Sequence, residues 1–291
     1  MNMETRFYDD INKFYTLATP FLLKREVENG LLLSLLNALK EDIHRYGEEM
    51  PLLFSLMEDN IIKLIALRTP PYDLLISYTS KVDSIDALVE ELLKRNENLP
   101  GILSFSEAAD RFTQLWCDKN SLESVLLRKE RVYKLEKVSK ETLGNNRFSV
   151  ATKTHQSIVI QWTREMITEA LLEVTKEELD RNITRFKVEF ENNNSQIFLL
   201  FHNGKPVSMA RKAGKTLNGN AVNLVYTPPS LRRRGYATEC VAKLSKYLLE
   251  EGNKYCFLFT DLSNPTSNSI YQKIGYHPII DKHHYKFIPK S

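Results

Sequence analysis

The first half of the chain changes between helix-like and strand-like spacing of its apolar residues. Apolar positions recur at helical intervals over residues 14–46, and Pro20 marks a break or a helix start, so this segment predicts two helices. Apolar runs at 61–67 and 74–78 flank a turn-forming stretch that contains two prolines and an aspartate, which predicts a β-hairpin.

Two amphipathic helices and a strand are predicted next. Apolar residues repeat at helical spacing over 85–95, and Ser104 with Glu107 matches the S-x-x-E pattern of a capping box ahead of a second helix that ends near Cys117. Apolar and charged residues alternate over 131–138, which predicts a strand.

A polar segment, 139–147, separates these elements from a second set. We therefore predict an N-terminal α+β domain over 1–145 and a C-terminal domain over 146–291. The C-terminal domain begins with two predicted helices, 157–172 and 176–191.

Antiparallel strands follow these helices. Asn203 and Gly204 separate two apolar runs, and an Asn-Gly pair in that position is a strong hairpin signal because both turn residues need a positive φ. A second pair, Asn218 and Gly219, precedes another apolar run. The three predicted strands are 197–201, 206–211 and 221–226.

Composition narrows the class of protein. Of the 291 residues, 42% are apolar and 26% charged, which is typical of globular proteins large enough for two domains. The net charge of +3 comes from 40 basic and 37 acidic residues spread along the chain, so we expect neither nucleic acid nor a membrane surface as a partner. The three cysteines form no CxxC pair, which argues against a disulfide framework or a zinc site.

We expect a cytoplasmic protein. The N-terminus lacks the basic segment and apolar run of a signal peptide. The longest apolar stretch, 31–39, is far shorter than the roughly 20 residues that span a membrane. An odd number of cysteines also fits a reducing compartment.

A basic turn leads from the third strand into a helix whose apolar residues share one face. A strand that enters a helix in this way directs backbone N–H groups at one spot, where the helix dipole adds positive potential. Gly235 lets the backbone approach a ligand closely, so we predict a pyrophosphate site; the alternative is a surface arginine cluster. The turn consists of Arg232, Arg233, Arg234, Gly235, Tyr236, Ala237 and Thr238.

A short helix is predicted after a strand at 256–260. Asn264 suits its N-cap, Pro265 its first position and Gly275 its C-terminal end, which needs a left-handed residue. At helical spacing, three residues of this segment share one face. They are Asn264, Asn268 and Tyr271.

These two blocks resemble the acetyl-CoA signature of the GNAT superfamily. Its Arg/Gln-x-x-Gly-x-Gly/Ala pattern is matched by Arg232, Gly235 and Ala237, and the preceding strand end also fits. The resemblance implies a GNAT fold in the C-terminal half, with a mixed, mostly antiparallel central sheet and flanking helices. It also implies acetyl-CoA as the co-substrate, with no metal.

Residue roles follow from the resemblance as expectations. It implies that Asn264 and Asn268 bond the pantetheine amides, that the Val225 N–H polarises the thioester carbonyl, and that Tyr271 protonates the departing thiolate. A phenol can serve as such an acid when it is well positioned. Candidates for the general base are Glu189, Glu191 and Asp261, or a water relay.

The N-terminal half has an element order similar to a degenerate GNAT copy without the phosphate turn. This order is similar to that of tandem acyltransferases of the glycine N-acyltransferase and FR47-like type, in which the N-terminal half helps to form the acceptor side. The alternative is an unrelated α+β module through which the chain forms a homodimer. We expect transfer of an acetyl group to a primary amine of a small molecule or peptide; the alternative is a catalytically idle acyl-CoA-binding sensor or interaction protein.

Other chemically suggestive residues have simpler interpretations. His283 and His284 could suggest a metal site, but no second ligand cluster at fixed spacing accompanies them or His277. Nucleic-acid binding through the three adjacent arginines is disfavoured, because they point in different directions and lack an aromatic platform.

Overall fold

The computed structural model describes residues 3–81, 83–170, 174–192 and 196–290. The described chain forms two compact units. The first contains Met1–Val132, Phe259–Asn264 and Pro278–Ser291, and the second contains Tyr133–Leu258 and Pro265–His277. The sequence-based boundary at 145/146 stays a prediction about functional domains.

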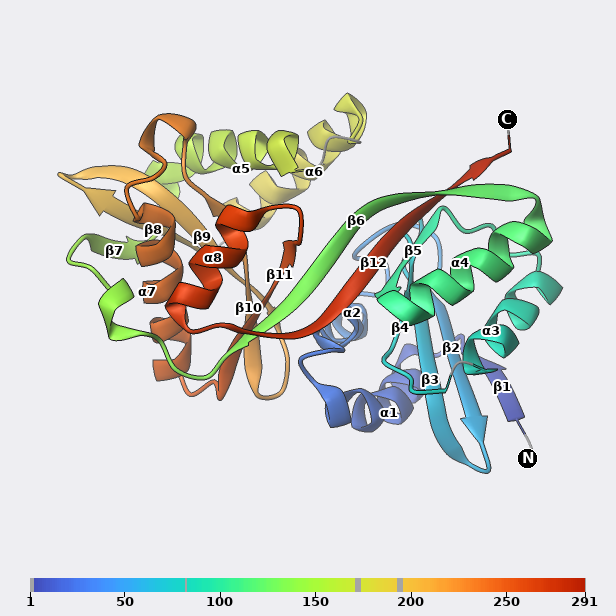
Figure 1. The fold of residues 1–291 in the computed structure, drawn as a ribbon. Coiled ribbons are helices and arrows are strands. Elements are labelled where there is room, and N and C mark those ends of the chain that lie inside the picture. The colour runs from blue at the N-terminus through green and yellow to red at the C-terminus, as the bar shows by residue number, and fades with distance from the viewer. Residues whose placement is uncertain (1–2, 82, 171–173, 193–195, 291) are drawn as a thin grey trace. The chain divides into compact units, whose positions relative to one another are not determined.

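The same order of elements occurs twice along the chain, namely strand, two helices, three strands, helix, strand, helix and strand (Figure 1). This repeat confirms the α+β class and is consistent with a doubled fold; that the first copy is a degenerate one stays a prediction. The first series is β1 (Met3–Phe7), α1 (Ile11–Leu22), α2 (Gly30–Glu41), β2 (Leu52–Glu58), β3 (Ile61–Arg68), β4 (Leu74–Ile76), α3 (Asp83–Lys94), β5 (Gly101–Phe105), α4 (Ser106–Asn120) and β6 (Leu122–Leu135). The second series is β7 (Arg147–Val150), α5 (Gln156–Ala170), α6 (Lys176–Glu191), β8 (Gln196–His202), β9 (Lys205–Lys215), β10 (Gly219–Tyr226), α7 (Tyr236–Glu250), β11 (Tyr255–Asp261), α8 (Pro265–Ile274) and β12 (His277–Pro289).

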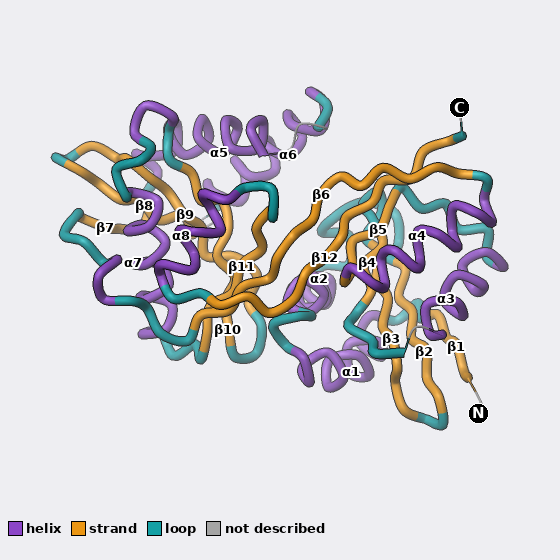
Figure 2. Tube along the Cα trace, viewed as in Figure 1, coloured by secondary structure: helices purple, strands orange, loops and turns teal. Residues whose placement is uncertain are grey.

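Strand pairing also repeats. Strands β1 to β4 pair antiparallel in sequence order and β5 joins β4 in parallel, just as β7 to β10 pair antiparallel and β11 joins β10 in parallel (Figure 2). The last strand of the chain pairs with the first unit, since β12 runs antiparallel to β5 with Lys282 opposite Phe105. The C-terminal strand therefore completes the sheet of the N-terminal series.

Helices cover both faces of each unit's sheet. Alternate residues of a strand point to opposite faces, so Phe198 and Leu200 of β8 pack with α7 and α8, whereas Ile197 and Leu199 pack with α5 and α6. In the first unit, α3 and α4 cover one face and α1 and α2 the other. In the described part of the chain, no helix is long and apolar enough to cross a bilayer.

Most predicted elements are present, but the sequence analysis missed strands β1, β2, β5 and β7, and β6 spans Leu122–Leu135 rather than 131–138. Pro20 lies inside α1, near its end, and does not break it. The capping box is wrong, because Ser104 belongs to β5, where its Oγ donates to the Ile76 carbonyl, and α4 begins after Phe105. The expected end of the first α-helix of the second domain, at 171–172, lies outside the described residues.

The two Asn-Gly pairs behave differently. Asn203 and Gly204 both have positive φ values, 48° and 77°, and form the β8–β9 turn as predicted. Gly219 instead is the first residue of β10, and a Cβ there would lie 2.2 Å from the Tyr255 ring. Close packing, rather than turn geometry, explains this second glycine.

Candidate active site

Strand β10 is irregular at its C-terminal end. Asn223 pairs with Arg211 of β9 and Tyr226 pairs with Met209, so Leu224 and Val225 together face a single residue of β9. Leu224 takes up this bulge with a φ of 47°. Val225, the predicted carbonyl-polarising residue, therefore lies in a local interruption of the antiparallel ladder.

The ladder between β10 and β11 ends before this bulge. Strands β10 and β11 pair in parallel from Gly219 and Tyr255 to Ala221 and Phe257, and in the described residues the register extends no further. The bulge with Val225 therefore lies beyond the last pair of this parallel ladder.

The basic turn ends in a helix start that has no side-chain cap. Gly235 is the N-cap of α7, with φ 80° and ψ 0°, and in the described structure no side chain caps the first turn. A Cβ at Gly235 would meet nothing within 4 Å. The left-handed backbone explains the glycine, and the open space in front of it lets an anion reach the N–H groups of the first turn.

Arg232 of the signature is held by two contacts, and its predicted role at the phosphates stays a prediction. Its Nε donates to the Thr227 carbonyl at 2.9 Å, and its Nη2 forms an ion pair with Glu169 of α5 at 2.6 Å. These contacts tie the turn to the end of β10 and to α5. Arg233 and Arg234 are exposed, and Arg233 has a positive φ of 61°.

A tyrosine and two glutamates extend this network, and the sequence analysis missed them. The Tyr226 hydroxyl donates to Glu165 at 2.9 Å and to Glu169 at 3.2 Å. Burial and the two carboxylates raise the pKa of Tyr226, so the phenol stays protonated. The only sequence signal was the spacing of Glu165 and Glu169, which places them on one face of a helix but says nothing of β10.

Helix α8 has the ends that the sequence predicts. It begins at Pro265, directly after Asn264. At its C-terminus the Tyr276 N–H donates to the Tyr271 carbonyl and the Gly275 N–H to the Gln272 carbonyl, a Schellman motif in which Gly275 has a φ of 115°. The Schellman motif therefore ends α8 at a defined residue.

Tyr271 lies inside the core on the sheet side of α8. It is 8% exposed, and its ring centre lies 6.3 Å from that of Tyr133 and 6.0 Å from that of Tyr276. Burial raises the pKa of Tyr271 to about 12. The hydroxyl is therefore a hydrogen-bond donor throughout the physiological pH range.

One hydrophobic cluster brings several predicted residues together. Tyr236 of the phosphate turn and Tyr271 of α8 belong to the cluster between the sheet and helices α7 and α8, and Val225 packs against it. Asn264 belongs to the other compact unit, so its place at the site stays a prediction. The roles of Glu189, Glu191 and Asp261 as general bases also stay predictions.

The corresponding connection in the first series is chemically different. The segment from β4 to α3 contains no glycine, and α3 carries Asp83 and Asp86 in its first turn. Asp86 forms a bidentate pair with Arg111, at 2.9 and 2.7 Å. Helix α7 also has an acidic residue in its first turn, Glu239, but Asp83 lies at the first position of α3, where the dipole favours an anion and a carboxylate would compete with a phosphate.

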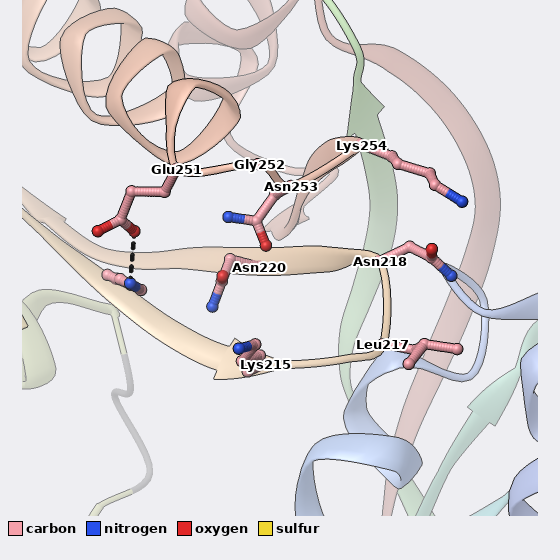
Figure 3. A pocket seen from close by; sticks show the side chains of 9 residues that line it. Lys215, Leu217, Asn218, Asn220, Glu251, Gly252, Asn253 and Lys254 are labelled. Carbon is pink, nitrogen blue, oxygen red and sulfur yellow. Dashed lines mark hydrogen bonds and ion pairs between the residues drawn. The ribbon is translucent and has the colours of Figure 1, made fainter.

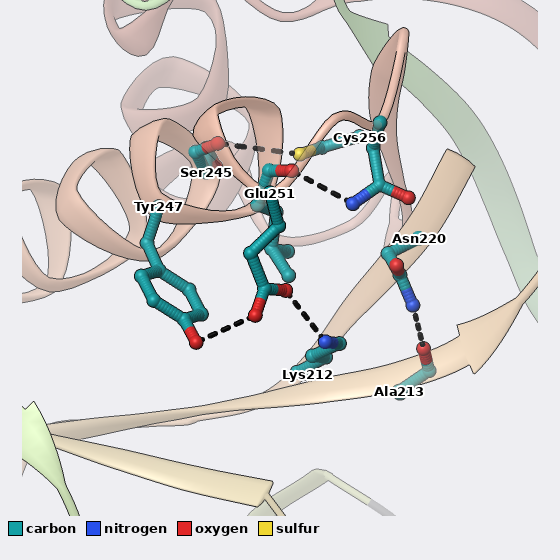
Figure 4. A network of polar contacts seen from close by, with 9 residues as sticks. Lys212, Ala213, Asn220, Ser245, Tyr247, Glu251 and Cys256 are labelled. Carbon is teal, nitrogen blue, oxygen red and sulfur yellow. Dashed lines mark hydrogen bonds and ion pairs between the residues drawn. The ribbon is translucent and has the colours of Figure 1, made fainter. Parts of the chain in front are cut away.

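A separate hollow of about 430 Å³ lies at the opposite end of α7 (Figure 3). Lys212, Lys215 and Lys254 are among the residues that line it. Glu251 in its wall is bound by Lys212 at 2.6 Å and by the Tyr247 hydroxyl at 2.6 Å (Figure 4). This hollow is distinct from the predicted phosphate turn, which lies at the N-terminal end of α7.

The histidines near the C-terminus have hydrogen-bond partners in the first unit. His284 bonds Asp73 at 2.6 Å and Arg128 at 3.0 Å, and His283 bonds Asp110 at 2.6 Å. Within the described ranges, no group of three histidine, cysteine, aspartate or glutamate side chains is arranged to hold a metal ion.

A known protein family matches the part of the chain that contains Val225, Gly235 and α8. Residues 160–276 match the family model described as the acetyltransferase (GNAT) family. This segment is a GNAT domain. It contains the bulge of β10, the phosphate turn and α8, so the candidate site lies within the part of the chain that defines the family.

Solved structures resemble the whole chain. A Drosophila protein matches 99% of this chain over 99% of its own length, with a TM-score of 0.67 and 12% identity. A GNAT-family acetyltransferase from Colwellia psychrerythraea covers 99% and 100%, with a TM-score of 0.57 and 12% identity. A tandem GNAT protein from the clavulanic acid biosynthesis pathway covers 100% of both chains, with a TM-score of 0.58 and 8% identity.

These identities are low, so the likenesses show the fold alone. They agree with the doubled element order found above, and they include a tandem GNAT protein over its full length. No curated protein matches the sequence significantly. The comparisons therefore show a match to the acetyltransferase (GNAT) family at residues 160–276 and a likeness of fold over the whole chain.

Proposed function

We propose that the chain is an acetyl-CoA-dependent N-acetyltransferase that moves the acetyl group to a primary amine by direct attack on the thioester. One observation carries this proposal: the GNAT domain combines an uncapped helix start at Gly235 with a bulged strand end at Val225. The first feature suits a pyrophosphate and the second suits a polarised carbonyl.

The reaction needs two contributions from the protein, one at the carbonyl oxygen and one at the sulfur. The amine forms a C–N bond as the C–S bond breaks, and the proton that leaves nitrogen ends on the coenzyme A sulfur. The Val225 N–H stabilises the carbonyl oxygen as it gains negative charge. Tyr271 gives its proton to the sulfur and is reprotonated by the proton that the attacking nitrogen releases.

The pKa of Tyr271 sets a condition on this step. With a phenol pKa of about 12 and an ordinary thiol pKa of about 8.5, complete transfer to a free thiolate is uphill by about 5 kcal/mol. Proton donation must therefore accompany cleavage of the C–S bond, while negative charge builds on sulfur. Tyr271 thus acts by hydrogen bonding to the leaving group before it releases the proton.

The first series of elements is proposed to serve the acceptor. It has the same fold order as the GNAT series, but its helix start carries Asp83 and Asp86 in place of a phosphate turn. A copy that does not bind coenzyme A is free to contribute residues for the amine. The acceptor would be a small molecule or a peptide.

A substrate screen tests this function. Purified full-length protein is mixed with acetyl-CoA and separate panels of polyamines, amino acids, aminoglycosides and peptide amines, and free thiol is followed over time. Acceptor-dependent thiol release with a matching acetylated product is expected. Coenzyme A binding without transfer to any panel would favour the alternative of a catalytically idle acyl-CoA sensor.

A further inference from the structure

Ser208 of β9 carries a buried hydroxyl that the mechanism above does not use. It has no exposed surface, and its Oγ donates to the Tyr226 carbonyl at 3.1 Å. The Thr227 hydroxyl donates to the same Ser208 oxygen at 2.9 Å. One serine of β9 therefore holds two successive residues at the end of β10 by hydrogen bonds that lie outside the strand ladder.

The chemistry of the groups fixes the direction of these bonds. A carbonyl oxygen only accepts, so the Ser208 hydroxyl gives its single hydrogen to Tyr226, and its lone pairs accept from Thr227. The Cys240 thiol also lies beside Ser208, but sulfur is the weaker acceptor. Removing the Ser208 hydroxyl would therefore take a donor from a carbonyl in a buried environment, which is costly.

The bonds of Ser208 lie directly after the bulge of β10. Leu224 has a φ of 47°, a left-handed conformation that costs energy for a residue with a Cβ. Such a residue keeps its conformation only where the surrounding structure imposes it. The ladder resumes at Tyr226, opposite Met209. Val225 therefore lies between a strained residue and one that Ser208 holds in place.

Ser208 and Val225 also share one face of the sheet. Ser208 pairs with Leu200 of β8, which packs toward α7 and α8, and paired residues point to the same face. Val225 packs against the same cluster. We propose that Ser208 is a positioning residue for acetyl transfer, whose hydroxyl holds the C-terminal side of the bulge and so keeps the Val225 N–H directed at the thioester carbonyl. This inference rests on the proposed function.

The test follows the infrared stretching frequency of the acetyl carbonyl in isotope-labelled acetyl-CoA bound to the full-length protein. An N–H that polarises this carbonyl weakens the C=O bond, so binding should lower the frequency. Ser208→Ala should lose roughly half or more of this shift, because the Val225 N–H is no longer held in direction. The acetyl-CoA Kd should stay within about threefold of the original value, since only one hydrogen bond is weakened.

Ser245 of α7 provides a matched control. It also has no exposed surface, and its hydroxyl bonds the Tyr276 hydroxyl at 2.8 Å rather than β10. Ser245→Ala should lower the melting temperature about as much as Ser208→Ala and keep the full frequency shift. Ser208→Cys retains a weaker donor, so its shift should lie between those of serine and alanine, and it keeps the test decisive if Ser208→Ala does not fold.

The outcomes separate this inference from the proposed function. A full shift in Ser208→Ala, or in Ser208→Cys if only that variant folds, would overturn the role of Ser208 alone. An equal loss of the shift in Ser245→Ala would also overturn it, because any lost buried hydroxyl would then disturb the site. If the unmodified protein does not bind acetyl-CoA, or binds it without a shift, the role of Val225 in the proposed function fails together with this inference.

Discussion

Replacing Gly235 by alanine tests the phosphate turn, and its consequences can be worked out from the backbone. Gly235 has a φ of 80°, and a Cβ at this position would meet nothing within 4 Å. The substitution therefore creates no clash in the ligand-free protein. Its cost to stability is the left-handed backbone alone, roughly 1–2 kcal/mol for a residue with a Cβ.

Gly235→Ala should affect coenzyme A affinity more than stability, and through a different cause. The added methyl group would occupy the open space through which an anion reaches the start of α7. Displacing a phosphate from one N–H loses a charge-assisted hydrogen bond of about 1.5–3 kcal/mol, which is roughly a 10- to 150-fold rise in the coenzyme A Kd. Calorimetry with coenzyme A measures this change, and thermal unfolding measures the stability cost.

Gly204 provides a matched control for the backbone effect. It has a φ of 77° in the β8–β9 turn, and a Cβ there would also meet nothing within 4 Å. Gly204→Ala should lower the melting temperature about as much as Gly235→Ala while leaving the coenzyme A affinity unchanged. Equal affinities for the two variants would refute the assignment of the turn.

Four further results are expected. Tyr271→Phe should lower kcat by roughly 10²- to 10⁴-fold in steady-state assays with little change in acetyl-CoA affinity, and near-normal kcat would assign the acid elsewhere. Burial raises the Tyr271 pKa from 10.0 to about 12. The neutral phenol therefore contributes fully to the free energy of unfolding below pH 10, and this contribution is lost as pH rises toward 12. This loss of about 3 kcal/mol in urea unfolding should disappear in Tyr271→Phe. Glu169→Gln removes the negative charge beside Arg232 in a half-exposed ion pair, so the melting temperature should hardly change. Coenzyme A should bind about threefold tighter at low salt. Weaker binding would mean that Glu169 holds the turn of Arg232 in place. Burial lowers the pKa of Lys282 from 10.5 to about 8, so the protein should gain up to about 3 kcal/mol of stability as pH rises from 8 to 10.5. Lys282→Met should remove that rise. An identical pH profile in the variant would exclude a buried lysine with a lowered pKa.

The sequence predicts the conformation of the turn before α7 well because local rules govern it. A strand, a glycine with positive φ and an amphipathic helix are all properties of neighbouring residues, and Gly235 and Gly275 take the conformations that their positions predict. The hairpin at Asn203 and Gly204 follows for the same reason. The repeated order and pairing of the strands fit a doubled fold, whereas the degenerate character of the first copy stays a prediction.

Long-range contacts explain what the sequence does not reveal. The ion pair of Arg232 with Glu169 joins residues 63 positions apart, and the hydrogen bond of Tyr133 with Asn268 joins residues 135 apart. The bulge at Leu224 likewise depends on how β9 and β10 pair, since a leucine gives no local signal for a positive φ. Tyr133 also belongs to the same compact unit as α8 although it lies before the predicted boundary at 145/146, and only tertiary packing shows that.

Calorimetric titration of the chain with acetyl-CoA tests whether the Gly235 turn is its single coenzyme A site. The chain contains two GNAT-like series of elements, but only the second has a glycine turn and a helix start free of acidic residues at its first three positions. We expect one binding site per chain, whose acetyl-CoA affinity Gly235→Ala lowers at least tenfold and Gly204→Ala leaves unchanged. Two equivalent sites, or a single site that is insensitive to Gly235→Ala, would contradict it.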